Sequence, residues 1–328
     1  SRPTFVPNSS GKQVETLKNR AVADLIEPGS TFKIVTVAAA LDQRILSLDD
    51  TVWCEKGRFL YAGRYLNDHE PFGTLTMTGV LVHSSNIGAA KIAIMLGNER
   101  MHRAMLDFGF GEKAFGEKPE EGWPGEIRGI VHPLRNWSQV SITRVAMGHE
   151  IGATPIQMAN AMGAIANGGN LMRPQIIRRL VDDNGNVVRE FHPHVLRRVM
   201  DQQAARDITR ALKHVVSKEG TAERAAVPGF AVAGKTGTAQ KVVNGQYVHD
   251  QFVASFVGYL PADDPELCIY VMLDNPKGKE YAGGVIAAPV FRAIAERSAS
   301  YLNLKPSGQF FPASDPTILR AANRGVTP

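Results

Sequence analysis

The segments with strand character gather near the C-terminal end of this chain, and their placement constrains the fold more than any other sequence feature. Three such runs, 230–242, 247–260 and 266–274, follow one another with only short turns between them. Helical patterns dominate the middle of the chain instead. Strands and helices separated in this way favour a mostly antiparallel sheet with a helical subdomain over alternating βαβ units. We therefore predict a mixed α+β fold.

Helices are expected where an apolar run carries a start or a stop signal. Pro28-Gly29-Ser30-Thr31 ends extended chain and opens an apolar run at 32–41, so a buried helix is expected to begin there. Another helix is predicted over 155–166, before Asn167-Gly168-Gly169. The remaining expectations are helices at 76–96, 99–108, 202–216 and 287–302, short strands or a loop at 51–66, an irregular excursion at 109–138, a hairpin around Asp183-Asn184-Gly185 within 173–192, and a loop with one short strand in 1–20.

Composition excludes several classes of protein. A chain of 328 residues with 44% apolar and 21% charged residues is not disordered, coiled-coil or collagen-like. The net charge is +5, without a dense basic stripe and without a GxGxxG or Walker loop after a strand, so neither nucleic-acid nor nucleotide binding is supported. No run approaches the roughly 18 apolar residues of a transmembrane helix. Cys54 and Cys268 lack the short spacing of a zinc site, and a disulfide between them is left open.

Ser30 and Lys33 form the first of three motifs that suggest chemistry. Because they stand three positions apart at a predicted helix start, both lie on one face of the helix. A serine hydroxyl is a poor nucleophile until a base removes its proton, and an amine can do this when burial or another cation lowers its pKa. The ordinary alternative for this motif alone is a helix-capping serine beside a solvated lysine.

Ser84-Ser85-Asn86 is the second motif, and it lies inside a mostly apolar stretch that is predicted to be helical. Polar side chains among buried apolar ones need partners. Ser84 could relay a proton between Lys33 and a leaving amine, while Asn86 could hold Lys33 and donate to a substrate carbonyl. Taken alone, the triplet is better explained as a helix start with a capping serine.

The third motif, Gly234-Lys235-Thr236-Gly237-Thr238, falls on a predicted strand. It combines a positive charge, two hydroxyls and a glycine that lets another chain approach closely. Such a strand suits an extended peptide whose terminal carboxylate is held by the hydroxyls and the ammonium group. Period-two alternation sends Lys235 and the threonines to opposite faces, so they can share one ligand only along an exposed sheet edge. An edge strand protected by a lysine is the simpler alternative.

These three motifs, in this order, occur together in penicillin-binding proteins and class A β-lactamases. The chain resembles the penicillin-binding transpeptidase family, and most of all its class B, division-type (septal) enzymes. The likeness spans about residues 3–304. It is carried by the segments Pro3-Thr4-Phe5, Glu27 to Lys33, Ser84 to Gly88, Thr154 to Ala159, Ala166 to Gly169, Lys235 to Lys241, Ser255 to Gly258 and Ala287 to Phe291.

The resemblance implies a β-lactamase/transpeptidase-like fold, in which helices flank a mainly antiparallel five-stranded sheet and an all-helical subdomain is added. It implies a D,D-transpeptidase that forms a serine acyl-enzyme from the D-Ala-D-Ala end of a peptidoglycan stem peptide, releases D-Ala and passes the acyl group to an acceptor amine. β-Lactams would acylate the same serine, and no metal or organic cofactor is required. The implied catalytic residues are Ser30, Lys33, Ser84, Asn86 and Lys235, the substrate-binding residues are Thr236, Gly237 and Thr238, and the oxyanion hole is formed by the backbone N–H groups of Ser30 and Thr238.

Two other functions are left open. A β-lactam-hydrolysing relative would need a glutamate that drives water onto the acyl-enzyme; no ExxLN segment follows Asn86, but acidic residues do occur before Lys235. These are Glu120, Glu121, Glu126 and Glu150. A non-catalytic β-lactam sensor or peptide-binding scaffold would use the same fold, although the intact motifs argue against a degenerate scaffold.

The resemblance also implies an organisation and a location. We expect a transpeptidase domain at 1–304 and a Pro-rich tail at 305–328. Family members of this type carry an N-terminal membrane anchor and a pedestal domain, which are absent from this chain, so we expect a soluble excised fragment. The parent protein is expected at the bacterial cell membrane with its catalytic domain on the periplasmic side. Its expected partners are divisome and glycosyltransferase membrane proteins.

Several aromatic and histidine residues near the motifs are open to two interpretations. His83 precedes Ser84, but the lysine already fills the role of base, and His149 is expected to be structural. Tyr247, Phe252 and Tyr281 follow the third motif and could form a wall of the substrate groove or simply pack on the sheet.

Overall fold

The computed structural model describes residues 18–117, 122–243 and 245–306. The predictions for the first residues, including Pro3-Thr4-Phe5, and for the tail beyond Pro306 lie outside these ranges. In the described part of the chain, no helix is long and apolar enough to cross a lipid bilayer.

The main sheet consists of the three strands expected near the C-terminal end. They are β11 (Ala233–Val243), β12 (Gln246–Leu260) and β13 (Leu267–Asp274), which pair antiparallel in the order β11-β12-β13. The mixed α+β prediction is confirmed, whereas the described residues supply three strands to this sheet instead of five. The remaining described strands pair locally away from it: β1 (Thr51–Trp53) with β4 (Thr74–Thr76), β2 (Arg58–Tyr61) with β3 (Arg64–Asn67), β5 (Ile130–Val131) with β6 (Ile151–Gly152), β7 (Asn170–Met172) with β10 (Val195–Arg198), and β8 (Arg179–Val181) with β9 (Val187–Glu190).

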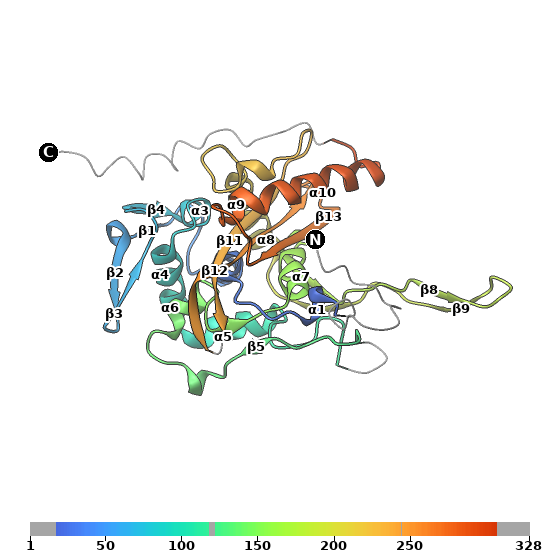
Figure 1. Cartoon of the computed structure of the whole chain (residues 1–328), viewed down its shortest axis with the longest axis horizontal. Coiled ribbons are helices and arrows are strands. Elements are labelled where there is room, and N and C mark those ends of the chain that lie inside the picture. Colours follow the sequence, from blue (N-terminus) through green and yellow to red (C-terminus); the bar gives the residue numbers. More distant parts are fainter. Residues whose placement is uncertain (1–17, 118–121, 244, 307–328) are drawn as a thin grey trace.

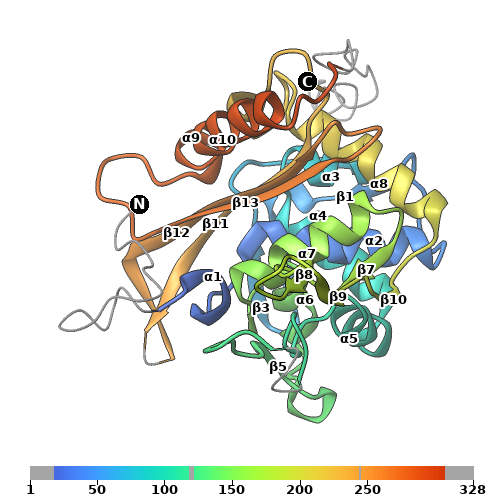
Figure 2. The same ribbon diagram turned by 90° about the vertical axis from the view of Figure 1, so that its right-hand side faces the viewer.

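Helices cover both faces of the sheet (Figure 2). On one face lie α9 (Gly283–Ile286) and α10 (Ala288–Tyr301), where the rings of Phe256 and Phe291 meet edge to face with centroids 4.7 Å apart. On the other face lie α7 (Pro155–Ala166) and α8 (Gln202–Val215). Both sides of the sheet therefore face apolar cores, which explains the nearly continuous burial of the second half of β12.

The helical subdomain is built around α2 (Lys33–Asp42). Every residue of α2 except the last is buried, because α4 (Asn86–Leu96), α5 (Asn98–Asp107) and α8 pack around it. The other helices are α1 (Arg20–Ala23), α3 (Met77–Val82) and α6 (Ser141–Val145), with 3₁₀ turns at η2 (Gly29–Phe32), η3 (Glu55–Gly57), η4 (Leu134–Asn136) and η5 (Glu223–Ala225). The hairpin β2–β3 lies at one end of the molecule and β8–β9 projects from the other (Figure 1).

Two expectations about helices need correction. The stretch 76–96 is not one helix, because α3 ends at Val82 and α4 begins at Asn86. The helix expected near Ser30 begins as the 3₁₀ turn η2 and becomes α-helical at Lys33. Both corrections concern segments that carry the motifs. The disulfide that was left open between Cys54 and Cys268 is not formed, because both cysteines are free.

Candidate active site

The turn that carries Ser30 is held against the main sheet. Gly29 has a φ of +56°, a left-handed conformation that favours glycine, and its N–H donates to the carbonyl of Gly148 at 3.2 Å. A Cβ built on Gly29 would lie 3.0 Å from that of Ala239 on β11. Thr31 ties the turn internally by donating to Pro28 O at 2.7 Å. The half-buried Ser30 is thereby presented next to the strand of the third motif.

Lys33 begins α2 and is fully buried. Its Nζ donates to Ser84 O at 2.5 Å, to Asn86 Oδ1 at 2.8 Å and to Ser84 Oγ at 3.2 Å. Burial lowers the pKa of Lys33 to about 7, although the Asp68 carboxylate partly opposes this shift. An amine with a pKa near neutrality is deprotonated often enough to act as a general base.

The segment between α3 and α4 turns two of the three polar side chains of the second motif, Ser84 and Asn86, toward Lys33. Ser84 has a φ of +55°, which a non-glycine residue adopts only when its surroundings hold it there. Ser85 caps α4 by accepting from Gly88 N at 2.9 Å. A continuous helix would have spread these residues around its circumference, so the break is what brings Ser84 and Asn86 to the same amine.

Lys235 reaches the same hydroxyl from β11. It is fully buried, and its Nζ donates to Ser84 Oγ at 2.9 Å and to Thr236 O at 3.1 Å. Burial and the nearby Lys33 cation both hold the pKa of Lys235 well below its usual range. With both lysines donating to it, Ser84 Oγ has its two lone pairs engaged and its own O–H left to donate.

Lys235 and Thr236 alternate in side-chain direction along β11, but the Lys235 side chain is long enough to reach Thr236. Thr236 points to the opposite face, where its Oγ1 lies 3.0 Å from Thr221 Oγ1, yet Lys235 Nζ curls back to within 3.4 Å of that same Thr236 Oγ1. Thr238 Oγ1 accepts from Gly283 N at 3.0 Å. Within the described residues β11 is an edge strand, as a shared ligand would require.

Gly237 was expected to let another chain approach closely, but the segments that approach it belong to the same chain. A Cβ at Gly237 would lie 2.9 Å from Thr31 Cγ2 and 2.5 Å from Ser255 Oγ. The absence of a side chain therefore lets the serine turn dock on β11. Nothing in this geometry tests its predicted contact with substrate, which stays a prediction.

Asp68 was missed by sequence reasoning although it touches the second motif. Its Oδ1 accepts from the backbone N–H groups of Asn86 and Ile87, and its Oδ2 accepts from Ser85 Oγ at 2.7 Å. It lies 18 residues before Asn86 and just after β3, so no helix-capping spacing signals the contact.

A group of hydrogen bonds around the Glu27 carboxylate lies beside the serine turn. Glu27 Oε2 contacts His149 Nδ1 at 2.8 Å and accepts from the Tyr247 hydroxyl at 3.0 Å, while Glu27 Oε1 accepts from Glu150 N at 2.9 Å. Burial raises the pKa of Glu27, but these hydrogen bonds and the charge of His149 outweigh it and leave the pKa below its usual value. The structural interpretation of His149 agrees with this contact.

The other weighed aromatic residues pack in pairs. The ring of His83 lies against Phe72, with centroids 5.2 Å apart. Phe252 and Tyr281 stack with centroids 4.2 Å apart. Whether the latter pair lines a substrate groove stays a prediction.

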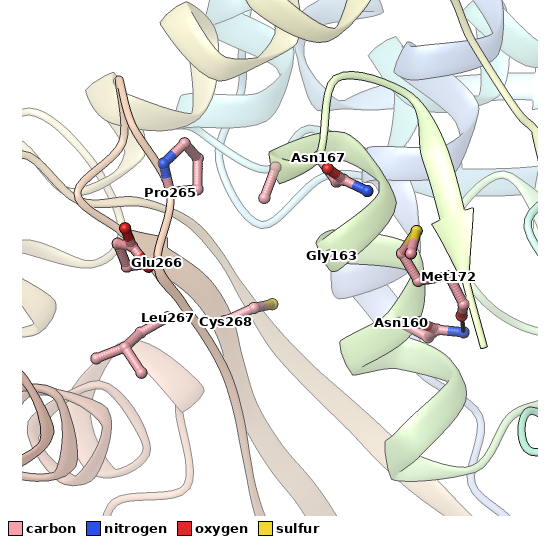
Figure 3. Close-up of a pocket in the computed structure, with 9 residues that line it drawn as sticks. Asn160, Gly163, Asn167, Met172, Pro265, Glu266, Leu267 and Cys268 are labelled. Carbon is pink, nitrogen blue, oxygen red and sulfur yellow. Dashed lines mark hydrogen bonds between the residues drawn. The ribbon is translucent and has the colours of Figure 1, made fainter. Parts of the chain in front are cut away.

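A separate pocket of about 270 Å³ lies between α7 and the start of β13 (Figure 3). Asn160, Asn167 and Met172 line one side, and Glu266 and Cys268 line the other. None of the predicted site residues lines it. Among the described residues there is also no group of three or more His, Cys, Asp or Glu side chains that could hold a metal ion.

A serine at a helix start, with two buried lysines meeting on a second serine, is the arrangement of a serine acyltransferase that uses lysine instead of histidine as its base. Residues 1–296 match the penicillin binding protein transpeptidase domain, and the chain belongs to this family. The mixed fold agrees with this assignment.

Among curated relatives, the chain is 37% identical to stage V sporulation protein D of Bacillus subtilis over 311 residues, which cover 93% of this chain and 47% of that protein. It is 31% identical to the probable peptidoglycan D,D-transpeptidase PenA of Neisseria flavescens over 306 residues, covering 93% of this chain and 72% of that protein. Against PenA of Neisseria gonorrhoeae it covers 50% of the protein. The chain thus spans about half the length of most of these relatives.

Solved structures show the same fold. The apo transpeptidase domain of penicillin-binding protein 3 from Burkholderia pseudomallei superposes with a TM-score of 0.78 at 35% identity, covering 89% of this chain and 84% of that one. Penicillin-binding protein 3 of Mycobacterium tuberculosis in complex with ampicillin gives a TM-score of 0.82 at 34% identity, covering 90% and 66%. The prediction of a β-lactamase/transpeptidase-like fold is confirmed.

Proposed function

We propose that this chain is the catalytic domain of a peptidoglycan D,D-transpeptidase. The observation that carries the proposal is the meeting of Lys33 and Lys235 on Ser84 Oγ, at 3.2 and 2.9 Å, beside the turn that carries Ser30. Two buried amines of lowered pKa supply a base and an electrostatic partner without histidine or metal. Homology to relatives named as D,D-transpeptidases supports the substrate class.

In the acylation step, neutral Lys33 takes the proton of the Ser30 hydroxyl while Ser30 Oγ attacks the carbonyl of the penultimate D-Ala. The negative charge on the carbonyl oxygen is received by the backbone N–H groups of Ser30 and Thr238. The C–N bond then breaks, and the leaving D-Ala amine takes a proton through the Ser84 hydroxyl, which Lys33 recharges. Asn86, Thr236 and Thr238 place the peptide and its terminal carboxylate, with Gly237 between the threonines.

In the second step, the acceptor amine of another stem peptide attacks the ester carbonyl and gives a proton to the same serine–lysine pair. Ser30 leaves with a proton, and a cross-link is formed. A β-lactam opens on Ser30 in the first step, but its amine stays attached and hinders the second. On this mechanism, we expect the β-lactam adduct to be released only slowly.

The cellular setting belongs to the same proposal. Relatives named for sporulation and for D,D-transpeptidase activity support a role in cell-wall synthesis, here proposed to be septal. We propose that residues 1–304 act as the catalytic domain, with 305–328 as a tail, on the outer side of the bacterial cell membrane. Divisome and glycosyltransferase membrane proteins would be partners of the complete protein.

A hydrolytic relative receives no specific support from the described residues. Glu126 accepts from Phe115 N at 3.2 Å, and Glu150 pairs with Arg144 at 3.5 Å, so both contact other parts of the chain than the lysine pair. Glu120 and Glu121 lie outside the described ranges.

The test is intact mass after incubation with benzylpenicillin. We expect one adduct that persists for at least many minutes in the wild type and none in Ser30→Ala. Ser300→Ala, a matched change at an exposed serine of α10 outside the motifs, serves as a folded control that keeps the adduct. Rapid hydrolysis without a lasting adduct would indicate a β-lactamase, and the absence of any adduct would indicate a scaffold.

A further inference from the structure

The strand that ends at Asn67 places a carboxylate under the second motif. Asp68 accepts three hydrogen bonds there: from the N–H groups of Asn86 and Ile87, the latter at 3.0 Å, and from Ser85 Oγ at 2.7 Å. These are the first two backbone donors of α4, which have no partner within the helix. Asp68 therefore ties the hairpin β2–β3 to the start of α4.

This contact orients the residue that holds the base. Asn86 Oδ1 accepts from Lys33 Nζ at 2.8 Å, and Asn86 Nδ2 donates to Asn67 O at 3.1 Å. Asn67 thus binds the side chain of Asn86, and Asp68 binds its backbone N–H. The preceding Ser84 has a strained backbone, and the residues that follow it are held by Asp68.

Asp68 also supplies negative charge to a site that buries two lysines. Water cannot stabilise these cations, and the charge of Lys33 disfavours protonation of Lys235. The Asp68 carboxylate acts in the opposite direction and raises the pKa of Lys33. Other titratable groups lie nearby. His69 and His83 both pack on Phe72, and Glu70 acts on His83. The Cys54 thiol is contacted by Ser85 Oγ at 3.4 Å, and Glu55 forms an ion pair with Lys91, whose charges offset each other.

We propose that Asp68 is a positioning residue for acyl transfer, which holds the loop from Ser84 to Asn86 against Lys33 and balances the charge of the buried lysines. The inference rests on the proposed function, because it concerns the same base. Without the carboxylate, Lys33 would lose its proton more readily and become a weaker base. The expected result is a base that is active at lower pH but slower at its plateau.

Asp68→Asn tests the charge while preserving the contacts. Its Oδ1 can accept from the same two N–H groups, and its Nδ2 can donate to Ser85 Oγ. We expect the acid limb of the rate of Ser30 acylation by a fluorescent penicillin, measured from pH 5 to 9, to move to lower pH by about half a unit or more. The plateau rate should fall several-fold.

Asp50→Asn is the matched control. Asp50 also accepts from a backbone N–H and a serine hydroxyl, those of Ser47 at 2.6 and 2.9 Å, but it is exposed and lies outside the lysine cluster. Its acid limb should coincide with that of the wild type. Asp68→Ser, neutral and able to accept from one N–H, repeats the test if the Asn variant folds poorly.

The outcomes separate the two proposals. A lower plateau with an unmoved acid limb in either neutral variant overturns the charge role of Asp68 and leaves only loop support. An unchanged plateau together with an unmoved limb overturns the inference as a whole. In either case wild-type acylation on Ser30 still supports the proposed function, whereas a wild type without an adduct removes that function itself.

Discussion

At the scale of single residues, the chemistry of this chain depends on lysines that have been taken out of water. Lys33 and Lys235 each have no solvent-exposed surface, and their Nζ atoms meet on Ser84 Oγ. A surface lysine near its usual pKa would be protonated at neutral pH and could not accept the proton of Ser30. Burial disfavours the charged form, so the fold itself prepares the base.

The lowered pKa of Lys33 predicts how acylation depends on pH. Because the neutral amine is the base, the rate should be low when Lys33 is protonated, rise with pH through about 7, and level off above it. Stopped-flow acylation by a chromogenic cephalosporin from pH 5 to 9 measures this limb. A flat profile across that range would contradict Lys33 as the base.

Replacing Lys33 provides a second test of its role as the base. Lys33→Met keeps much of the apolar volume and removes the amine, so acylation should fall by about 10²–10⁴-fold. The melting temperature should also fall, because Ser84 O and Asn86 Oδ1 lose their donor. If Lys33→Met acylates at the wild-type rate, the base lies elsewhere.

At the scale of elements, the serine turn is docked by close approaches of backbone. Gly29 packs on β11, and Gly148, in the turn after α6, packs on Gly29. A Cβ at Gly148 would lie 2.3 Å from Gly29 O, and its φ of +80° is unfavourable for a side chain. The position of Ser30 therefore depends on a turn more than a hundred residues away in the sequence.

Two glycine substitutions should change the free energy of unfolding in opposite directions. Gly148→Ala should lower the free energy of unfolding by about 2 kcal/mol or more and slow acylation by at least about tenfold, since the serine turn is displaced. Gly163→Ala lies in the middle of α7, with no atom within 4 Å of the added Cβ. It should raise the free energy of unfolding by about 0.5–1 kcal/mol. Urea titrations of both variants provide the measurement. An unchanged acylation rate in a folded Gly148→Ala protein would refute the docking argument.

At the scale of the whole molecule, the catalytic body and the β8–β9 arm are distinct. Every residue of β8 and β9 is exposed, and the arm projects from the body in Figure 1. Its root is closed by Arg173 N, which donates to His194 O at 2.9 Å. The arm therefore adds little to the core, although it displays exposed apolar side chains such as Ile176 and Val188.

Replacing residues 176–191 by an Asn-Gly turn should change the free energy of unfolding by less than about 1 kcal/mol. The acylation rate should stay within about twofold of wild type, because the arm contributes no residue to the lysine cluster. Thermal denaturation and the penicillin adduct assay measure both quantities. A large loss of either would show that the arm supports the body after all.

Much of the fold was predictable because its signals are local. The helix over 155–166, the helix near 202–216 and the three C-terminal strands each follow from periodicity and from turn or cap residues next to them. The single helix over 76–96 was wrong at Ser84, because the apolar residues on both sides continue a helical pattern. The alternative of a helix start with a capping serine is confirmed at Ser85. Tertiary contacts at Asp68 and at the two lysines stabilise the break at Ser84 and leave no local trace.

The sequence by itself determined the order and identity of the motifs, the family and the mixed fold, since these depend on residue types at short spacing. Only the tertiary structure decided which atoms meet. It brought Lys235 to Ser84 from 151 positions away, set Asp68 beneath Asn86, and assigned Gly237 to the docking of the serine turn. The physical reason is that burial and charge balance arise where distant segments pack together, so the pKa of Lys33 is a property of the folded molecule.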